Sequence, residues 1–263
     1  EQKIKISTYK EDGNIEQKYK QNIAMATAIR EALNDKRIIC YYQPIVDQRT
    51  GKIYKYETLV RMINKEGEII PPIAFLEISK KTKLYPNITR EVLHQACNTF
   101  KNRKENFSIN LSIDDIKDIN IVNEIIETII ETNTASRITF EILESEEIEN
   151  YQEVLNFSKR IKEIGVKIAI DDFGTGYSNF EHILKLNVDY IKIDGSLIKG
   201  MENNNKNRII VETIVDFAKK IGVKTISEFV YNEATYLISK EIGIDYLQGF
   251  YIGKPSENLI EKQ

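Results

Sequence analysis

Oxygen-bearing side chains recur at the downstream ends of short strand-like segments in this chain. They are Glu57, Asn110, Glu141, Asp171, Asp172 and Glu228. A carboxylate that points into a barrel mouth is costly unless it binds a cation, so acids repeated at strand ends indicate a metal-binding rim. The chain has only 2 histidines and 2 cysteines, which leaves oxygen atoms as the available ligands. Hard cations, Mg²⁺ or Mn²⁺ before Zn²⁺ or Cu²⁺, are therefore expected.

Two of these acids, Asp171 and Asp172, are adjacent, and a regular strand cannot point both inward. We therefore expect Asp172 to belong to the loop DFGTGYSN, whose glycines let the backbone turn. Such a pair can bridge two cations about 3.5–4 Å apart, the arrangement that activates a water in phosphodiester cleavage. The glycine loop alone indicates only a turn, because it matches neither the G-x-G-x-x-G fingerprint nor the P-loop.

Side-chain alternation along the strands places basic groups beside the acids. In the segment 189–194, Lys192 lies on one face with Tyr190 and Asp194. A lysine directed into a barrel loses its proton unless acids surround it, so we expect several carboxylates to point at Lys192. The same alternation puts Arg61 on the face that carries Glu57.

Each of these residues also has a purely structural interpretation. Glu57 and Arg61 could form an ion pair, Asn110 could form a turn, and Lys192 with Asp194 could close the bottom of a barrel. Oxygen ligands at several independent strand ends are hard to obtain from ordinary loop composition, however. The set as a whole therefore favours a common site.

The elements that must position these residues alternate between strand and helix patterns. Strands are expected at 38–46, 53–61, 106–111, 137–142, 166–171, 189–194, 223–228 and 245–249. Helices are expected at 14–36, 73–81, 88–101, 120–132, 151–164 and 206–221. Only DQRTGK joins the first two strands, too short for a crossover helix, so they must form a hairpin. The predicted fold is α/β, a modified TIM-like (β/α)8 barrel with the first strand antiparallel.

Length and composition favour one barrel domain. The chain has 263 residues, of which 41% are hydrophobic, enough to fill the core of one α/β barrel. We expect residues 1–36 to form an N-terminal tail and linker helix, and residues 37–263 to form the barrel domain. The first residue is Glu1 rather than methionine, which suggests a segment of a longer protein.

Charge and cysteine usage limit the partners and the compartment. A net charge of -3 gives no basic field for a polynucleotide. No stretch approaches the roughly 18 apolar residues of a membrane span, and the first residues lack the apolar core of a signal peptide. Cys40 and Cys97 are too far apart for a metal or redox motif, which favours buried thiols in a reducing compartment. We expect a cytoplasmic location, either alone or as the cytoplasmic domain of a larger, membrane-attached protein.

These residues together resemble the EAL family of cyclic di-GMP phosphodiesterases, from about residue 36 to about residue 256. The motifs that carry the resemblance are QPI at Gln43, ETLVR from Glu57 to Arg61, INLS around Asn110, EILE from Glu141 to Glu144, DDFGTGYSN from Asp171, YIKID around Lys192, SEFV at Glu228 and LQGFYIGKP at Gln248. In combination these motifs are specific, because each position that the family uses for metal and catalysis carries the expected residue type.

The resemblance implies that water, activated by two cations, attacks one phosphodiester of cyclic di-GMP and opens it to the linear dinucleotide pGpG. The cations would be Mg²⁺ or Mn²⁺. It implies that one cation is held by Glu57, Asn110, Glu141 and Asp171, and that the second is held by Asp171 and Asp172. Glu228 would support both cations, directly or through water.

The resemblance also implies roles for the remaining motif residues. Lys192 would orient or help deprotonate the attacking water, with Glu228, Glu57 and Asp172 as its catalytic neighbours. Substrate contacts would come from Gln43, Arg61, Gln248 and Asp172. Glu144 would anchor the loop 172–179.

Several positions depart from the family pattern. Thr58 replaces the alanine of the signature but faces away from Glu57, and Leu143 replaces the threonine of E-x-T-E. Phe229 and Tyr231 replace the glycine and the second glutamate of E-G-V-E. If that glycine needs a positive φ or leaves room for substrate, Phe229 would strain the backbone or crowd the pocket. These departures leave an alternative open, a catalytically impaired receptor module that binds cyclic di-GMP.

Another reaction class also fits part of the pattern. Ligands on three consecutive strands plus a lysine suit proton abstraction with a metal-held enolate, although this leaves DDFGTGYSN and QPI without a role.

The start of the chain gives an indication of its partners. The segment IKISTYKEDGNIEQKYKQ resembles the connector after a GGDEF domain, which implies an upstream GGDEF or sensory domain. The family resemblance further implies a homodimer in which the loop 172–179 links pairing to metal geometry.

Overall fold

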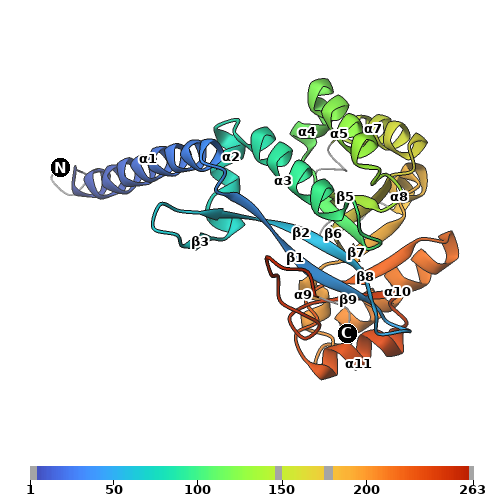
Figure 1. Cartoon of the computed structure of the whole chain (residues 1–263). Helices are drawn as coiled ribbons and strands as arrows, with labels where there is room; N and C mark the ends of the chain where they lie inside the picture. Colours follow the sequence, from blue (N-terminus) through green and yellow to red (C-terminus); the bar gives the residue numbers. More distant parts are fainter. Residues whose placement is uncertain (1–4, 146–149, 175–179, 261–263) are drawn as a thin grey trace. The chain divides into compact units, whose positions relative to one another are not determined.

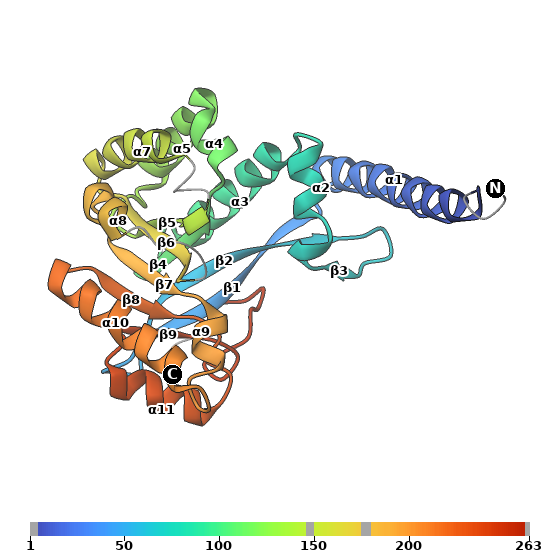
Figure 2. The same cartoon turned by 180° about the vertical axis from the view of Figure 1, so that it is seen from behind.

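The computed structural model describes residues 5–145, 150–174 and 180–260 (Figures 1 and 2). Its contacts divide the chain into two units. One unit comprises residues 1–39 and 60–91, and the other comprises residues 40–59 and 92–263. The expected division at residue 37 stays a prediction.

The strands lie close to the expected positions. They are β1 (Ile38–Asp47), β2 (Ile53–Ile63), β3 (Ile69–Ile70), β4 (Asn106–Asn110), β5 (Ile138–Leu143), β6 (Lys167–Phe173), β7 (Tyr190–Ile193), β8 (Lys224–Ser227) and β9 (Tyr246–Gln248). Of these, only the short β3 has no expected counterpart.

One helix precedes the first strand, and from β4 onward helices lie between consecutive strands. They are α1 (Lys5–Asn34), the 3₁₀ turn η1 (Pro72–Ala74), α2 (Leu76–Lys81), α3 (Tyr85–Phe100), α4 (Ile113–Lys117), α5 (Ile119–Thr132), α7 (Tyr151–Glu163), α8 (Phe180–Leu186), α9 (Gly195–Lys199), α10 (Asn205–Ile221) and α11 (Glu233–Ile242). The expected helix 73–81 is divided into η1 and α2 at Phe75. The helices α4, α8, α9 and α11 were not expected, because most are too short to show a clear 3.6-residue period.

The sheet closes on itself. The strand order is β1-β9-β8-β7-β6-β5-β4-β2-β3, and β1 also pairs with β2. The strands β2 and β4 to β9 are parallel to one another, whereas β1 is antiparallel to β9. The hairpin between β1 and β2 turns where the Asp47 carboxylate accepts the Thr50 backbone N–H at 2.8 Å. The modified TIM-like barrel with an antiparallel first strand is therefore confirmed.

Helices cover the outer face of the barrel strands (Figures 1 and 2). The apolar period that predicted α5 and α10 is the stripe that each helix buries, for example Ile121, Ile125 and Ile129 in α5. Asn133 and Gly222 end these helices in the left-handed conformation, so the chain can reverse toward the next strand. No helix of the described residues is long and apolar enough to cross a membrane.

The barrel interior is filled in layers, as strand alternation requires. One layer, here called the inner layer, consists of Ile45, Ala169, Tyr190, Ile226 and Tyr246, with Tyr54 packed against it. The Tyr54 and Tyr246 rings stack with centroids 4.2 Å apart. This layer lies toward the N-terminal ends of the parallel strands, so the residues two positions further along each strand form the next layer toward the barrel mouth.

The unit of residues 1–39 and 60–91 contains α1, the end of β2 and β3. The helix α1 begins at Lys5, before the expected start at Asn14. The strand β3 pairs antiparallel with the end of β2. An ion pair at 2.9 Å joins Lys65, between these strands, to Glu31 of α1.

Candidate active site

A layer of polar side chains crosses the barrel at its mouth, one step beyond the inner layer. Every strand of the closed ring contributes to it: Gln43 from β1, Glu57 from β2, Asn110 from β4, Glu141 from β5, Asp171 from β6, Lys192 from β7, Glu228 directly after β8, and Gln248 from β9. The sequence-predicted residues from these strands therefore meet in one place, because the C-terminal ends of parallel strands share one rim.

Lys192 lies at the centre of this layer and is 0% exposed. Its Nζ is 2.7 Å from Glu141 Oε2, 2.8 Å from Glu228 Oε1 and 2.9 Å from Asp171 Oδ1. A fourth carboxylate oxygen, Glu57 Oε2, lies 3.5 Å away. Strand alternation predicted this arrangement. The alternative pairing of Lys192 with Asp194 is wrong, since Asp194 caps α9 by accepting the Ser196 N–H.

Burial and the neighbouring charges shift the pKa values of Lys192 and Glu141 in opposite directions. Burial lowers the pKa of Lys192, but Asp171, Glu141 and the other carboxylates raise it further, to well above its ordinary value. Burial acts to raise the pKa of Glu141, yet Lys192 and Lys55 bring it below its ordinary value. Lys192 thus stays an ammonium and Glu141 stays a carboxylate.

Three other acids of the site, Glu57, Asp172 and Glu228, hold protons more tightly than usual. Burial raises the pKa of Glu57 and, more strongly, that of Glu228, although Lys192 opposes both changes. Burial and then the charge of Asp171 raise the pKa of Asp172 to about 6. The single ammonium of Lys192 therefore does not compensate all the neighbouring carboxylates, and the site favours additional positive charge.

Two amides fix the carboxylate of Glu57. The Asn110 Nδ2 donates to Glu57 Oε1 at 2.9 Å, and the Gln248 Nε2 donates to Glu57 Oε2 at 2.5 Å. Gln248 also donates to Gln43 Oε1 at 3.3 Å, and Gln43 in turn donates to the Gly253 carbonyl at 3.1 Å. Residues from β1, β2, β4 and β9 are thereby held in one hydrogen-bonded arrangement.

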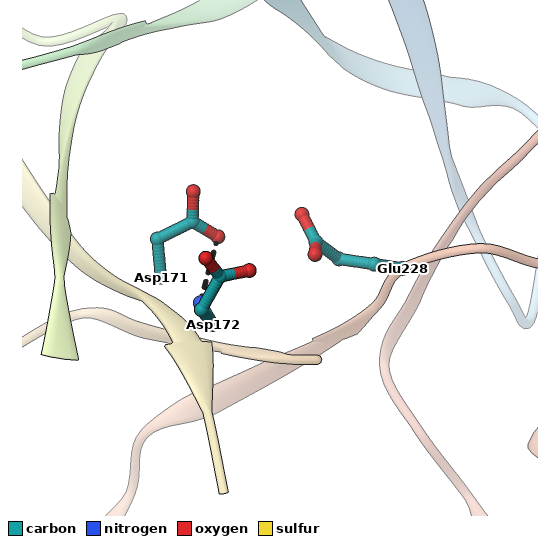
Figure 3. Close-up of side chains that lie close together, drawn as sticks. All are labelled: Asp171, Asp172 and Glu228. Carbon is teal, nitrogen blue, oxygen red and sulfur yellow. Dashed lines mark hydrogen bonds between the residues drawn. The ribbon is translucent and has the colours of Figure 1, made fainter. Parts of the chain in front are cut away.

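Asp171, Asp172 and Glu228 form a compact group in which one carboxylate oxygen of each residue lies within 4.8 Å of the other two (Figure 3). The backbone conformation makes this possible. The register of β6 against β7 shifts between Ile170 and Phe173, and Asp172 has a φ of 55°. This is a β-bulge, which turns Asp172 to the same side as Asp171. The expectation that Asp172 lies in the following loop is therefore wrong, because β6 extends to Phe173.

This donor set suits hard divalent cations. All its ligand atoms are oxygens, and the five acids Glu57, Glu141, Asp171, Asp172 and Glu228, here called the carboxylate cluster, surround one ammonium. Among the described residues, buried Oε1 atoms of Glu141 and Gln248 have no hydrogen-bond partner, so they are available for a further donor or cation. Carboxylate and amide oxygens are the ligands that Mg²⁺ and Mn²⁺ prefer.

Two predicted residues lie beside this layer. Glu144 is buried, and its Oε2 accepts the Gly174 backbone N–H at 3.0 Å. The rest of the loop that Glu144 was expected to anchor, residues 175–179, lies outside the described residues. Arg61 lies at the end of β2 within the other unit, where its Nη1 contacts the Val60 carbonyl at 2.8 Å. Its contact with a ligand stays a prediction.

A cavity of about 280 Å³ opens onto the polar layer. Its lining residues are Gln43, Glu57, Leu59, Glu228, Phe229, Tyr231, Gln248, Gly249 and Phe250. Carboxylate groups, amide groups and aromatic rings thus all line this cavity. Such a cavity suits a ligand that combines planar rings with anionic groups.

Phe229 has an unfavourable backbone conformation for its type, with a φ of 55°. The condition of a positive φ, under which Phe229 would strain the backbone, is therefore met at this position. Its side chain is 51% exposed, so packing does not compensate the strain. The neighbouring Tyr231 donates its hydroxyl to Glu202 at 3.0 Å. A Cβ at Gly195 would lie 2.8 Å from the Phe229 Cβ, so this glycine makes room for the ring.

Two residues near the site were missed from the sequence. Phe250 follows β9 and lines the cavity, but an aromatic residue just after a strand gives no warning of that position. Lys55 lies two residues before Glu57 and shares its face, so strand alternation could have identified it. Burial lowers the pKa of Lys55 to about 8, although Glu141 acts in the opposite direction.

Comparison with known proteins places this arrangement in a family. The profile of the EAL domain family matches residues 26–255. The chain belongs to the EAL domain family. Cyclic di-GMP phosphodiesterase PdeB of Shewanella oneidensis is 31% identical over 253 residues, which is 93% of this chain and 30% of PdeB. Cyclic di-GMP phosphodiesterase PdeF of Escherichia coli is 31% identical over 247 residues, 92% of this chain and 33% of PdeF. This EAL domain thus spans about a third of the length of these curated relatives.

A solved structure supports the same relationship. The PaMucR phosphodiesterase in complex with c-di-GMP superposes with a TM-score of 0.84 and is 28% identical. The match covers 89% of this chain and 97% of the PaMucR chain. The EAL domain fold therefore accounts for the barrel and its antiparallel first strand.

The raised pKa of Asp172 predicts how the cation-free protein responds to pH. Folding raises the pKa of Asp172 from its ordinary value of 3.8 to about 6, so the native state holds this proton more tightly than the unfolded chain does. The stability of the fold should therefore fall as pH rises through this range. With EDTA present, we expect Asp172→Asn to remove part of the loss in Tm between pH 5 and pH 7, measured by differential scanning calorimetry. Adding Mn²⁺ to the unmutated protein should raise its Tm more at pH 7 than at pH 5. Equal pH responses of the two proteins would contradict this prediction.

The positive φ of Phe229 predicts a stabilising substitution. Glycine adopts this conformation without the penalty of roughly 1–2 kcal/mol that a side chain incurs. We expect Phe229→Gly to be about 1 kcal/mol more stable than Phe229→Ala, which also lacks the ring but keeps the strain. Urea unfolding in EDTA measures the difference. Equal stability of the two variants would show that the backbone at this position is not strained.

Proposed function

We propose that this EAL domain is a metal-dependent phosphodiesterase that hydrolyses cyclic di-GMP to the linear dinucleotide pGpG. The observation that carries the proposal is the carboxylate cluster gathered around Lys192, of which Glu57 and Glu228 line the cavity together with aromatic residues. The names of PdeB and PdeF, and the ligand of the PaMucR structure, support the same substrate.

The proposed cations are two Mg²⁺ or Mn²⁺ ions. Residues that would hold one are Glu57, Asn110, Glu141 and Asp171, and those that would hold the other are Asp171 and Asp172, with Glu228 close to both. When bound, the cations would lower the pKa of a water and offset charge on the phosphoryl oxygens. The oxygen-only ligands and the excess of carboxylates over ammonium groups support this choice.

The chain's own groups position the reactants. Lys192 would donate an N–H to the attacking water, and Glu228 and Asp172 would accept its proton. Gln43 and Gln248 would orient the substrate beside Glu57, since their amides already form one hydrogen-bonded arrangement there. Arg61 would supply a cationic contact to the ligand, as the family resemblance implies.

The reaction is a single in-line displacement. The water oxygen would form a bond to phosphorus while the bond from phosphorus to the 3′ oxygen breaks. The water proton passes to the carboxylates, and the departing 3′ oxygen takes up a proton. The product would carry a 5′-phosphate and a free 3′-hydroxyl, and no covalent intermediate with the enzyme is needed.

The receptor alternative has one observation in its favour. The strained, half-exposed Phe229 lines the cavity next to Glu228, where it could narrow the space for substrate. A receptor without turnover has no need for a buried lysine among four carboxylates, however, and such an arrangement is costly to retain. The intact set therefore supports hydrolysis.

We further propose a cytoplasmic homodimer with an upstream GGDEF or sensory domain. The additional domain is supported by the length of the relatives, of which this chain spans about a third. One relative of this EAL domain is the bifunctional diguanylate cyclase/cyclic di-GMP phosphodiesterase MucR of Pseudomonas aeruginosa. Light scattering would test the dimer.

The test of the main proposal is product formation. The purified chain, incubated with cyclic di-GMP and Mn²⁺, should yield pGpG by liquid chromatography. Glu57→Gln should reduce the rate by at least roughly 100-fold, because it removes a charged ligand at a site fixed by two amides. Glu163→Gln, an exposed acid at the end of α7, is the matched control and should leave the rate unchanged.

The same assay separates hydrolysis from binding alone. Tight binding of cyclic di-GMP without pGpG would contradict the phosphodiesterase and favour the receptor. In that case the double substitution Phe229→Gly and Tyr231→Glu should produce turnover if the departures from the family pattern are responsible.

A further inference from the structure

A second buried lysine lies beneath the carboxylate cluster and has no role in the proposed reaction. Lys55 is 0% exposed, and its Nζ lies 3.8 Å from Glu141 Oε1. It also lies 4.5 Å from the centroid of the Tyr190 ring. Among the described residues, neither Lys55 Nζ nor Glu141 Oε1 has a hydrogen-bond partner. The ammonium is thus held by charge and by the aromatic face.

The position of Lys55 is unusual for a charged group. It lies two residues before Glu57 on the same face of β2, level with the inner layer, where other strands carry Ile45, Ala169 and Ile226. Taking an ammonium out of water is strongly unfavourable, and an apolar residue at such a position is often as stable or more stable. Stability of the fold therefore does not explain a lysine here.

Lys55 and Lys192 contact opposite oxygens of one carboxylate. Lys192 contacts Glu141 Oε2 at 2.7 Å, and Lys55 approaches Oε1 from the inner side. We propose that Lys55 is a positioning residue that acts through Glu141, restraining this ligand and limiting how tightly the site holds divalent cations. The inference rests on the proposed cation site, because any cation bound by Glu141 shares that carboxylate with Lys55.

Lys55 has two opposing effects on the affinity of the site for divalent cations, and the larger effect decides whether that affinity rises or falls when Lys55 is removed. Restraint of Glu141 favours cation binding, but Lys192 alone still fixes the carboxylate when Lys55 is removed. Repulsion between an ammonium and a divalent cation on the same carboxylate is much larger, since both charges are buried where water screens them weakly. Loss of Lys55 should therefore strengthen cation binding.

The experiment measures Mn²⁺ binding directly, without substrate, by electron paramagnetic resonance of free Mn²⁺ at pH 7. Lys55→Met should bind Mn²⁺ at least roughly tenfold more tightly than the unmutated chain. Lys167→Met is the matched control and should not change the affinity. Its Nζ also faces Tyr190, with the ring centroid 5.7 Å away, and it donates to the Tyr190 hydroxyl at 3.3 Å.

Further variants keep the proposal falsifiable. Lys55→Arg retains the charge and should retain the original affinity, and Lys55→Gln replaces Lys55→Met if circular dichroism shows that the methionine variant is unfolded. In a Glu141→Gln background, the effect of Lys55→Met should shrink, because the proposed coupling passes through that carboxylate. Unchanged or weaker Mn²⁺ binding by the neutral variants would overturn the proposal.

Failure of this inference differs from failure of the proposed function. If the unmutated chain forms pGpG but Lys55→Met leaves Mn²⁺ affinity unchanged, only the role of Lys55 is lost. If the unmutated chain binds no Mn²⁺ at all, the cation site itself is refuted, and the proposed hydrolysis with it.

Discussion

Repulsion among the acids of the carboxylate cluster is the interaction on which the site depends. Closure of the sheet brings them to one rim, and burial removes the water that would otherwise screen them. Lys192 relieves part of this repulsion by contacting four of them at once. Burial first, and then the remaining repulsion, raise the pKa values of Glu57, Asp172 and Glu228. A site built in this way favours cations by its own electrostatics, before any substrate arrives.

The layered filling of the barrel explains how so much charge can be tolerated. Each strand places an inner-layer residue and a polar residue two positions apart, as in Tyr190 and Lys192, or Ala169 and Asp171. The apolar and aromatic inner layer closes the interior, so the charged layer is supported from one side and faces the cavity on the other. Every strand that contributes to the inner layer has an apolar or aromatic residue at that level. The strand β2 instead has the buried Lys55 there.

Much of this arrangement follows from sequence periodicity. Alternation along the strands predicted that carboxylates face Lys192, and the short link DQRTGK predicted the hairpin. The bulge at Asp172 could not be predicted, because two consecutive acids have the same pattern in a loop and in a bulged strand. The contact between Lys55 and Glu141 joins residues far apart in sequence, and no local pattern gives the register between their strands. Periodicity identifies the face of a side chain, whereas its partners depend on tertiary structure.

Charge balance connects the cations, the substrate and Lys55. When all five carboxylates are ionised, the two ammonium groups of Lys55 and Lys192 leave an excess of three negative charges. Two divalent cations bring four positive charges, so the loaded site carries one positive charge, which a single phosphodiester group neutralises. Without Lys55 the loaded site would be neutral before substrate binds. The lysine that weakens cation binding therefore also leaves the site attractive to an anionic ligand, which gives a physical reason for a buried charge that the fold does not need.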